Sequence, residues 1–291
     1  MTDAVDTNAV AADTVDTGDH ACLTFTDPEE RWDLIAAFVR DGLRQGSKVL
    51  CWTDSITPDG LADQLKARSV RPGAALSRGQ LHLAPVAESL TGAAGGAAAM
   101  VAVLAAELDI ATRQGYRGLR VTADMSWATR PMAAAQELAA FESEVAELFA
   151  DGRLCLVCQY DRERFDAVTL AFAAKAHPKT ITAQVYHEHP LLRVCRQYSP
   201  PGIRVAGQID YQHRHVLEQA LTESLRLDRN PHVNLSGLDY IDGACANVIV
   251  AAAARLPASR HLTVTCRRRV AKVFDLLTAH TSPGLRVRLR P

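Results

Sequence analysis

The segment that decides the C-terminal fold reads Val233-Asn-Leu-Ser-Gly-Leu-Asp-Tyr-Ile-Asp242-Gly243-Ala244-Cys245-Ala246. Apolar and polar residues alternate up to an acidic residue, which is typical of a half-buried strand. Two small residues then open a long apolar segment, predicted to be a helix capped by Asp242. No hydroxyl side chain stands at this turn.

Strand and helix signals alternate along the rest of the chain. A helix is expected at Glu29–Gln45, a strand at Lys48–Trp52 and another helix at Phe165–His177. Near the segment quoted above, the pattern predicts a strand at Pro231–Leu235 and a helix at Gly243–Leu256. This alternation favours parallel sheets covered by helices. We therefore predict an α/β fold, with a doubly wound parallel sheet domain followed by a smaller α/β domain.

The domain boundaries follow from composition. Residues 1–17 are rich in Asp, Thr and Ala and are predicted to be a disordered tail. Residues 18–192 form the predicted first domain, with Thr180–Val185 as its last, edge strand. The breakers Ser-Pro-Pro-Gly at 199–202 place a linker at 193–202, before a second domain at 203–291.

Composition indicates a globular chain of two domains, with 291 residues, 48% hydrophobic and 22% charged. No apolar run approaches 18 residues, so no membrane-spanning helix is expected. Seven scattered cysteines are typical of free thiols in a reducing cytoplasm. From residue 201 onward there are 13 Lys and Arg against 7 Asp and Glu, although the whole chain has a net charge of -1. Such asymmetry favours two modules with different partners.

Three motifs of the C-terminal part resemble the STAS domain of anti-sigma-factor antagonists. They are Ile203-Arg-Val-Ala-Gly-Gln-Ile-Asp210, Asn234-Leu235-Ser236 and Ile241-Asp242. The last resembles the STAS phosphorylation loop, whose pattern is hydrophobic, hydrophobic, Asp, Ser, Ser or Thr, Gly. Here Gly243 and Ala244 stand at the two hydroxyl positions, and the Gly position is occupied by cysteine.

The STAS resemblance implies a protein partner, namely an anti-sigma factor or another protein of the serine-kinase type. In the family, a serine of the loop accepts phosphate from that partner. Ala244 cannot form the ester, so the resemblance implies a binding module that has lost its phosphoacceptor. Ser236 is an alternative acceptor, or it makes a local turn. The predicted partner-binding residues are Asp210, Ser236, Asp242, Gly243, Ala244 and Cys245.

The N-terminal part resembles the MEDS sensory domain (methanogen/methylotroph sensory domain), a RecA-like module of bacterial regulators. The resemblance covers about residues 18–192. It is carried by Gly18-Asp19-His20, Asp27–Gly42, the Asp124-Met125-Ser-Trp127 motif, Cys158-Gln-Tyr160-Asp161 and His177-Pro178. It implies a first domain with a RecA-like sheet.

Ligands of open α/β sheets bind in a crevice at the strand ends. We therefore expect a sensor crevice for a small molecule. Its predicted residues are His20, Asp124, Met125, Trp127, Tyr160, Asp161 and His177. Three of them have a structural role as the alternative. His20 would hydrogen-bond its own loop, Tyr160 would fill the core, and Asp161 would cap the next helix.

No cofactor is expected. A nucleotide site of the RecA type needs a Gly-rich loop ending in Gly-Lys-Ser/Thr, whereas Thr26-Asp-Pro-Glu29 is acidic. Cys155 and Cys158 are expected on opposite faces of a buried strand, which favours structural burial over a redox pair. His187 and His189 provide only two ligands, so no metal site is predicted.

The sequence thus predicts a non-catalytic cytoplasmic signalling regulator. The three arginines at 267–269 provide too few positive charges for direct binding of nucleic acid, so none is expected. No membrane contact is expected either. The alternatives are an enzyme that uses His20 and Asp124 as acid and base, and a scaffold that self-associates. A homodimer is compatible with each hypothesis.

Overall fold

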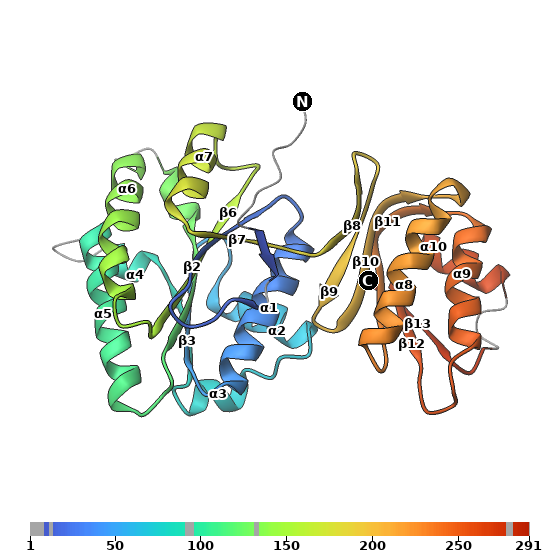
Figure 1. The fold of residues 1–291 in the computed structure, drawn as a ribbon, viewed down its shortest axis with the longest axis horizontal. Coiled ribbons are helices and arrows are strands. Elements are labelled where there is room, and N and C mark those ends of the chain that lie inside the picture. Colours follow the sequence, from blue (N-terminus) through green and yellow to red (C-terminus); the bar gives the residue numbers. More distant parts are fainter. Residues whose placement is uncertain (1–8, 12–13, 91–95, 131–133, 278–281, 291) are drawn as a thin grey trace. The chain divides into compact units, whose positions relative to one another are not determined.

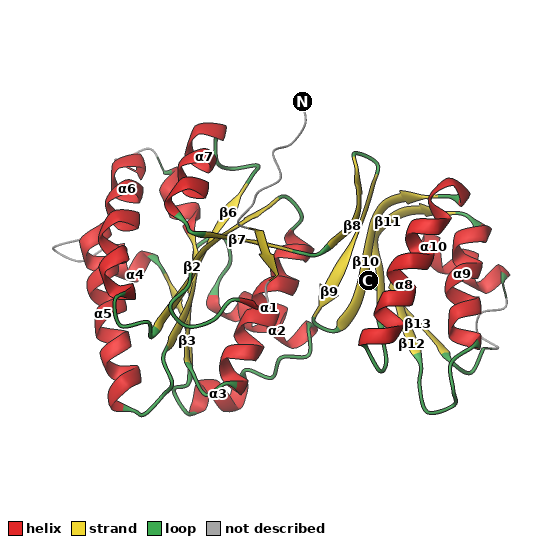
Figure 2. Ribbon diagram, viewed as in Figure 1, coloured by secondary structure: helices red, strands yellow, loops and turns green. Residues whose placement is uncertain are grey.

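The computed structural model describes residues 9–11, 14–90, 96–130, 134–277 and 282–290 (Figure 1). The chain divides into two compact units, residues 1–182 and 183–291. Each unit is a sheet with helices packed against it, as Figure 2 shows by secondary structure. The α/β fold class is therefore confirmed. None of the described helices has the length and apolar character that a membrane span requires.

Unit 1 is built on a seven-stranded sheet in which every pairing is parallel. In spatial order its strands are β1 (Ala9–Ala11), β7 (Lys179–Thr182), β2 (His20–Phe25), β6 (Leu154–Asp161), β5 (Leu119–Asp124), β3 (Lys48–Thr53) and β4 (Leu81–Pro85). Strand β2 lies between β6 and β7. From β2 the chain runs to β3 and the edge strand β4, returns through β5 to β6 beside β2, and then continues to β7 on the other side of β2. The sheet is parallel and alternates with helices along the chain, as the sequence predicts.

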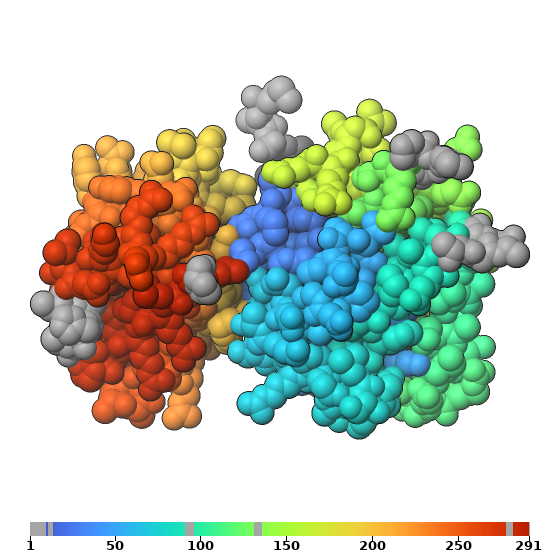
Figure 3. All heavy atoms as spheres, turned by 180° about the vertical axis from the view of Figure 1, so that it is seen from behind, coloured from blue at the N-terminus to red at the C-terminus, as the bar shows by residue number. Residues whose placement is uncertain are grey.

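Helices cover the sheet of unit 1. On one face lie α1 (Pro28–Arg44), α2 (Pro58–Ala67) and the short α3 (Gly73–Ser77), which are blue to cyan in Figure 3. Against the other face pack α4 (Ala87–Leu90), α5 (Ala97–Arg113), α6 (Ala134–Glu144) and α7 (Ala167–Ala176), with the 3-10 helices η2 (Met125–Thr129) and η3 (Val145–Phe149). The buried face of α5 is formed by Ala97, Met100, Leu104, Leu108 and Ala111.

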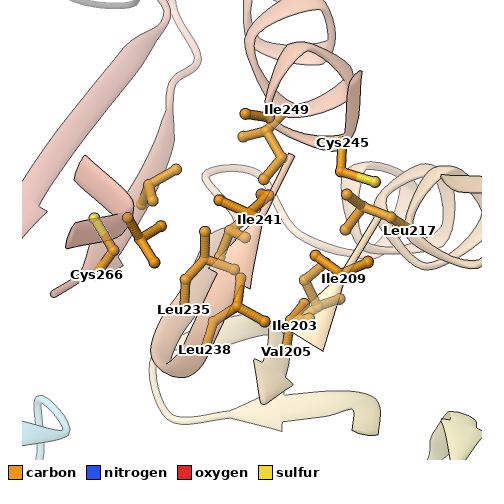
Figure 4. Packing of buried hydrophobic residues seen from close by; sticks show 14 of the residues in the cluster. Ile203, Val205, Ile209, Leu217, Leu235, Leu238, Ile241, Cys245, Ile249 and Cys266 are labelled. Carbon is orange, nitrogen blue, oxygen red and sulfur yellow. The ribbon is translucent and has the colours of Figure 1, made fainter. Parts of the chain in front are cut away.

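The described residues of unit 2 form a six-stranded mixed sheet and three main helices. In spatial order its strands are β13 (Leu285–Leu289), β12 (Leu262–Cys266), β11 (His232–Ile241), β10 (Pro201–Ile209), β9 (Leu192–Tyr198) and β8 (Val185–His189). Strands β10 to β13 pair in parallel, and β8 and β9 are antiparallel additions. The helices are α8 (Arg214–Leu227), α9 (Gly243–Ala254) and α10 (Arg268–Leu276), and the 3-10 turn η4 (Tyr211–His213) precedes α8. Figure 4 shows Ile241, Cys245 and Ile249 packed in the core between sheet and helices.

The linker predicted at 193–202 is wrong. These residues form most of β9 and the beginning of β10, which pair in a hairpin with Tyr198 opposite Pro201. Proline and glycine interrupt the periodicity there because the chain makes a tight turn within one sheet. The boundary between the units falls at residues 182 and 183 instead.

Two predictions at the ends of unit 1 are also corrected. Within the predicted tail, Ala9–Ala11 form β1 beside β7, and Val15 is buried at 3% exposure; residues 1–8 and 12–13 lie outside the described part. The expected edge strand at Thr180–Val185 is split. Its first part belongs to β7, which lies inside the sheet between β1 and β2, and Val185 begins β8 of unit 2.

Candidate functional sites

A buried polar cluster, called here the His-Glu-Cys cluster, lies on the α5–α7 side of the sheet of unit 1. It consists of His20, Glu142, Cys158 and His177, none of which is more than 7% exposed. One donor atom from each lies within 4.8 Å of the others. His20 Nε2 is 3.3 Å from Glu142 Oε2 and 3.8 Å from Cys158 Sγ, and His177 Nε2 is 3.5 Å from Glu142 Oε2.

Four elements bring these side chains together. His20 opens β2 and Cys158 lies in the neighbouring β6, so their side chains share one face of the sheet. Glu142 projects from α6, between the buried residues Phe141 and Val145. His177 is the C-cap residue of α7, where its ring Nδ1 lies 2.7 Å from the carbonyl oxygen of Ala173.

The cluster disfavours charge. Burial, with a contribution from His177, lowers the pKa of His20 to about 3. Burial also raises the pKa of Glu142, although His177 and the Tyr160 hydroxyl oppose that effect. Burial and the neighbouring Glu142 raise the pKa of Cys158 well above its ordinary value. His20, Glu142 and Cys158 are therefore held toward their uncharged forms.

Tyr160 is attached to the cluster through its hydroxyl group. The hydroxyl donates a hydrogen bond of 2.6 Å to Glu142 Oε1. The ring itself is fully buried and packs edge-on against Phe165. Tyr160 thus fills the core, as the structural alternative anticipates, and also orients the buried carboxylate.

Asp124 lies in a different environment, at the end of β5. Its carboxylate is 2.8 Å from the Arg31 guanidinium of α1 and accepts a bond of 2.9 Å from the Ser55 backbone N–H. Arg31 in turn donates a bond of 2.7 Å to the Gln159 side chain. Burial alone would raise the pKa of Asp124, but the charge of Arg31 and the bonds from Ser55 outweigh it and hold that pKa well below its usual range.

The seven residues predicted to form one sensor crevice are therefore divided. The structure joins His20, Tyr160 and His177 but separates Asp124, which belongs with α1 on the other side of the sheet. Met125 and Trp127 are buried in the apolar core, and Asp161 binds its own loop through the Glu163 N–H at 2.9 Å. The strand-end argument ignored the alternation of side chains, which sends neighbouring strand residues to opposite faces.

Sequence reasoning missed Glu142 and the contribution of Cys158 to a polar cluster. One signal was present for Glu142, because it interrupts an apolar stripe made by Leu138 and Phe141 of α6 and Val145 at the start of η3. An acid on the buried face of a helix requires a polar partner. Cys158 was correctly predicted to be buried on the face opposite Cys155, but its neighbours were not identified.

Unit 1 also has a small pocket that lies away from the His-Glu-Cys cluster and from Asp124. It has a volume of about 180 Å³ and is lined by residues of β3, β4, α4 and α5, among them Trp52, His82 and Glu107. None of the residues predicted for the crevice lines it. This pocket and the buried cluster are thus two separate features of unit 1.

In unit 2, the turn before α9 is held by Asp242. Its carboxylate accepts bonds of 2.8 Å from the backbone N–H of Cys245 and of 2.8 Å from that of Tyr211. It therefore caps α9 and ties this helix to the turn after β10. Gly243 and Ala244 are exposed, whereas Cys245 is buried and donates its thiol to the carbonyl of Asp210 at 3.1 Å.

The other two predicted residues of unit 2 have local partners. Asp210 caps the turn after β10 by accepting a bond of 3.0 Å from the Gln212 N–H. Ser236 is only 4% exposed, and its hydroxyl bonds the side chain of Asn234, with Arg290 at 3.3 Å. Ser236 lies within β11 rather than in a turn, and its partner is the neighbouring Asn234 side chain, so the local turn considered for it is not found.

Two exposed aromatic residues flank the turn and were not predicted as site residues. Tyr211 follows β10 and is 67% exposed, and Tyr240 lies near the end of β11 and is 52% exposed. Both strands end at the same edge of the sheet, since they pair in parallel and Ile209 lies opposite Ile241.

Comparison with known families identifies both units. The family described as MEDS, the MEthanogen/methylotroph, DcmR Sensory domain, matches residues 19–178. The family described as Mlab, STAS domain, matches residues 192–281. The first match covers more than half of the chain, so the chain belongs to the MEDS family, and it carries a STAS domain after the sensory domain. Both resemblances are confirmed, and the combination indicates a role in signalling or regulation, with a module of a kind that generally interacts with partner proteins.

No curated protein matches the chain. Among solved structures, similar ones are a KaiC-like protein from Pyrococcus horikoshii OT3 (9% identity, TM-score 0.46, 66% of this chain and 80% of that chain) and the flagellar accessory protein FlaH from Methanocaldococcus jannaschii (10%, 0.40, 66% and 86%). A third is an uncharacterized Pyrococcus horikoshii protein in complex with an unknown peptide (13%, 0.49, 66% and 94%). At TM-scores below 0.5, none of them supports a functional inference.

Proposed function

We propose that the chain is a non-catalytic cytoplasmic regulator. The MEDS unit senses a small molecule or an upstream protein, and the STAS unit binds an anti-sigma factor or another protein of the serine-kinase type. The family combination supports a signalling role. The observation that carries the finer proposal is the exposed turn at Gly243 and Ala244, which Asp242 fixes in place.

The turn at Gly243 and Ala244 offers an exposed docking surface but has no hydroxyl group that could be phosphorylated. Gly243 has no other atom within 4 Å of the position that a Cβ would take, so the surface is open there. Ala244 offers no oxygen for esterification. Ser236, the nearest alternative considered, is buried and hydrogen-bonded. Control would therefore come from the sensory unit, whose ligand must favour one arrangement of the chain to transmit a signal.

The two tyrosines supply the contacts that such an interface needs. Tyrosine is enriched among the residues that dominate binding energy, because it buries a large rigid ring and keeps a polar hydroxyl. Tyr211 and Tyr240 are both more than half exposed in this chain. We expect them to anchor the partner on either side of the turn.

Nucleotide hydrolysis is not part of the proposal. In a phosphate site of the RecA type, the helix after the first core strand presents its N-terminus to the phosphate. Here that helix is α1, whose end is occupied by the Asp27 cap and by Glu29, which is ion-paired with Arg68. The hypothesis of an acid–base enzyme is also disfavoured, since Asp124 pairs with Arg31 on α1 and His20 contacts Glu142 on α6.

The binding proposal is tested with the full-length protein and purified kinase-type anti-sigma proteins encoded in the same genome. Isothermal titration should detect binding by the wild type. Replacing Tyr211 and Tyr240 by alanine should weaken it by about tenfold or more each, the effect of losing a binding hot spot. Leu276→Ala is the matched control, because Leu276 is an apolar side chain 84% exposed on α10.

The proposal fails if no such protein binds, or if the tyrosine variants bind as tightly as Leu276→Ala. Sizing of the wild type by light scattering separates a regulator from the scaffold alternative. A scaffold would form concentration-dependent assemblies larger than a dimer, with or without the anti-sigma protein.

A further inference from the structure

We infer that the His-Glu-Cys cluster of unit 1 binds one divalent transition-metal ion, with zinc as the ion that its donors fit best. This site goes beyond the proposed function, and it stands whether or not the STAS unit binds a kinase-type partner. The donors are a thiol, two imidazoles and a carboxyl group, from Cys158, His20, His177 and Glu142. Mixed nitrogen, sulfur and oxygen donors are the ligands that zinc takes in proteins.

The spacing of the donor atoms fits a tetrahedral ion. Metal–ligand bonds of about 2.0–2.3 Å place the ligand atoms of a tetrahedral site about 3.3–3.8 Å from one another. The measured distances are 3.3 Å for His20 to Glu142, 3.5 Å for His177 to Glu142 and 3.8 Å for His20 to Cys158. All other pairs are within 4.8 Å. Movements of less than about 1 Å would complete the coordination shell.

The orientation of His177 is the strongest argument for a cation. A carbonyl oxygen can only accept, so the contact of 2.7 Å to Ala173 requires the proton on Nδ1 of His177. In the neutral ring, Nε2 then carries a lone pair, which faces Glu142 Oε2 at 3.5 Å. Both atoms are buried and neither has a hydrogen-bond partner. When Glu142 is ionised, these are two buried acceptors that face each other, which is costly, and a cation between them satisfies both.

The groups behind the ligands are those that support metal sites. A ligating histidine usually donates its second ring N–H to a carbonyl or carboxylate, as His177 does to Ala173. The Tyr160 hydroxyl fixes the Glu142 carboxylate with a bond of 2.6 Å. Four protein donors with no exposed position describe a closed site, which is typical of structural rather than catalytic zinc.

Charge balance also favours the ion. One divalent cation with a thiolate, a carboxylate and two neutral imidazoles has no net charge, which suits a buried site. On binding, the Cys158 thiol loses its proton to solvent and its sulfur forms the metal bond. The same step releases a proton from Glu142 wherever that group is protonated.

The test uses the full-length protein, stripped with a chelator and titrated with Co²⁺ as a spectroscopic substitute for zinc. The wild type should bind one Co²⁺ per chain and show the visible bands of a four-coordinate ion together with a thiolate-to-cobalt charge-transfer band. Cys158→Ser should lose the charge-transfer band. Glu142→Gln and His177→Ala should weaken binding by at least about tenfold.

Cys155→Ser is the matched control, because Cys155 is a buried cysteine of the same strand on the opposite face. Its variant should keep both sets of bands. If Cys158→Ser does not fold, the wild type and Glu142→Gln decide the question through the rise in unfolding temperature that Zn²⁺ causes, which the wild type should show and Glu142→Gln should largely lose. Failure of the wild type to bind Co²⁺ and Zn²⁺, or equal binding by Cys158→Ser and Cys155→Ser, would overturn the assignment.

Discussion

At the scale of single residues, the environment of a side chain decides what its chemistry can do. Asp124 looked like a ligand-binding acid from its position at a strand end. In the structure its buried carboxylate bonds to the buried Arg31 guanidinium and to Ser55 at the surface. Its role is to join α1 to the end of β5.

We therefore predict that Asp124→Asn destabilises unit 1. Removing one partner of a buried ion pair leaves the other charge uncompensated, which typically costs about 3–5 kcal/mol. Equilibrium denaturation of the full-length variant measures this change. Asp63→Asn is the control, since Asp63 forms an exposed ion pair with Lys66 and should change stability by less than about 0.5 kcal/mol.

The effect of Asp124→Asn should depend on pH. The folded state lowers the pKa of Asp124 below the ordinary value of 3.8, so the ion pair contributes fully above about pH 4. This contribution is lost as the pH falls toward the folded pKa. The difference in unfolding free energy between wild type and variant should thus shrink in acid, and a difference that grows below pH 4 would contradict the assignment.

At the scale of secondary-structure elements, alternation predicted the order of strands and helices but not their limits. The strand predicted at Pro231–Leu235 continues as β11 to Ile241, because alternation persists up to the Asp242 cap. The breakers at 199–202 were read as a linker, although a tight hairpin needs the same residues. Composition alone does not distinguish a turn within a sheet from a connection between domains.

One element depends on a particular glycine. Gly207 in β10 has a φ of 93°, and a Cβ at this position would lie 2.2 Å from the carbonyl oxygen of Leu191. We predict that Gly207→Ala destabilises unit 2 by more than about 1 kcal/mol, because the clash is with backbone and the backbone angle is strained. Thermal unfolding tests this.

Gly243→Ala is the matched control for Gly207→Ala, because Gly243 is the first residue of α9 in the same unit. Nothing lies within 4 Å of its Cβ position, and alanine is the better helix former at the start of α9. Its stability should equal or slightly exceed that of the wild type. Equal losses in Gly207→Ala and Gly243→Ala would show that the local geometry of β10 is not the cause.

At the scale of the whole molecule, two partial sets of motifs were enough to predict both domain families. Sequence motifs could not predict the His-Glu-Cys cluster. Its members lie at positions 20, 142, 158 and 177, and only the sheet order that places β2 beside β6 brings them together. A motif can identify a family, whereas a site assembled from distant elements requires their arrangement in space.

The account of the STAS unit depends on a surface that binds its partner without being phosphorylated. The deciding measurement incubates the wild type and Ala244→Ser with ATP and the kinase-type protein that binds the wild type, and maps phosphate by mass spectrometry. Since Ala244 is exposed, the new hydroxyl should be tolerated and accessible. We predict phosphate at residue 244 of the variant, with weaker binding, and none on the wild-type STAS unit. Phosphate on Ser236 or any other hydroxyl of the wild-type unit would show that the switch is still present.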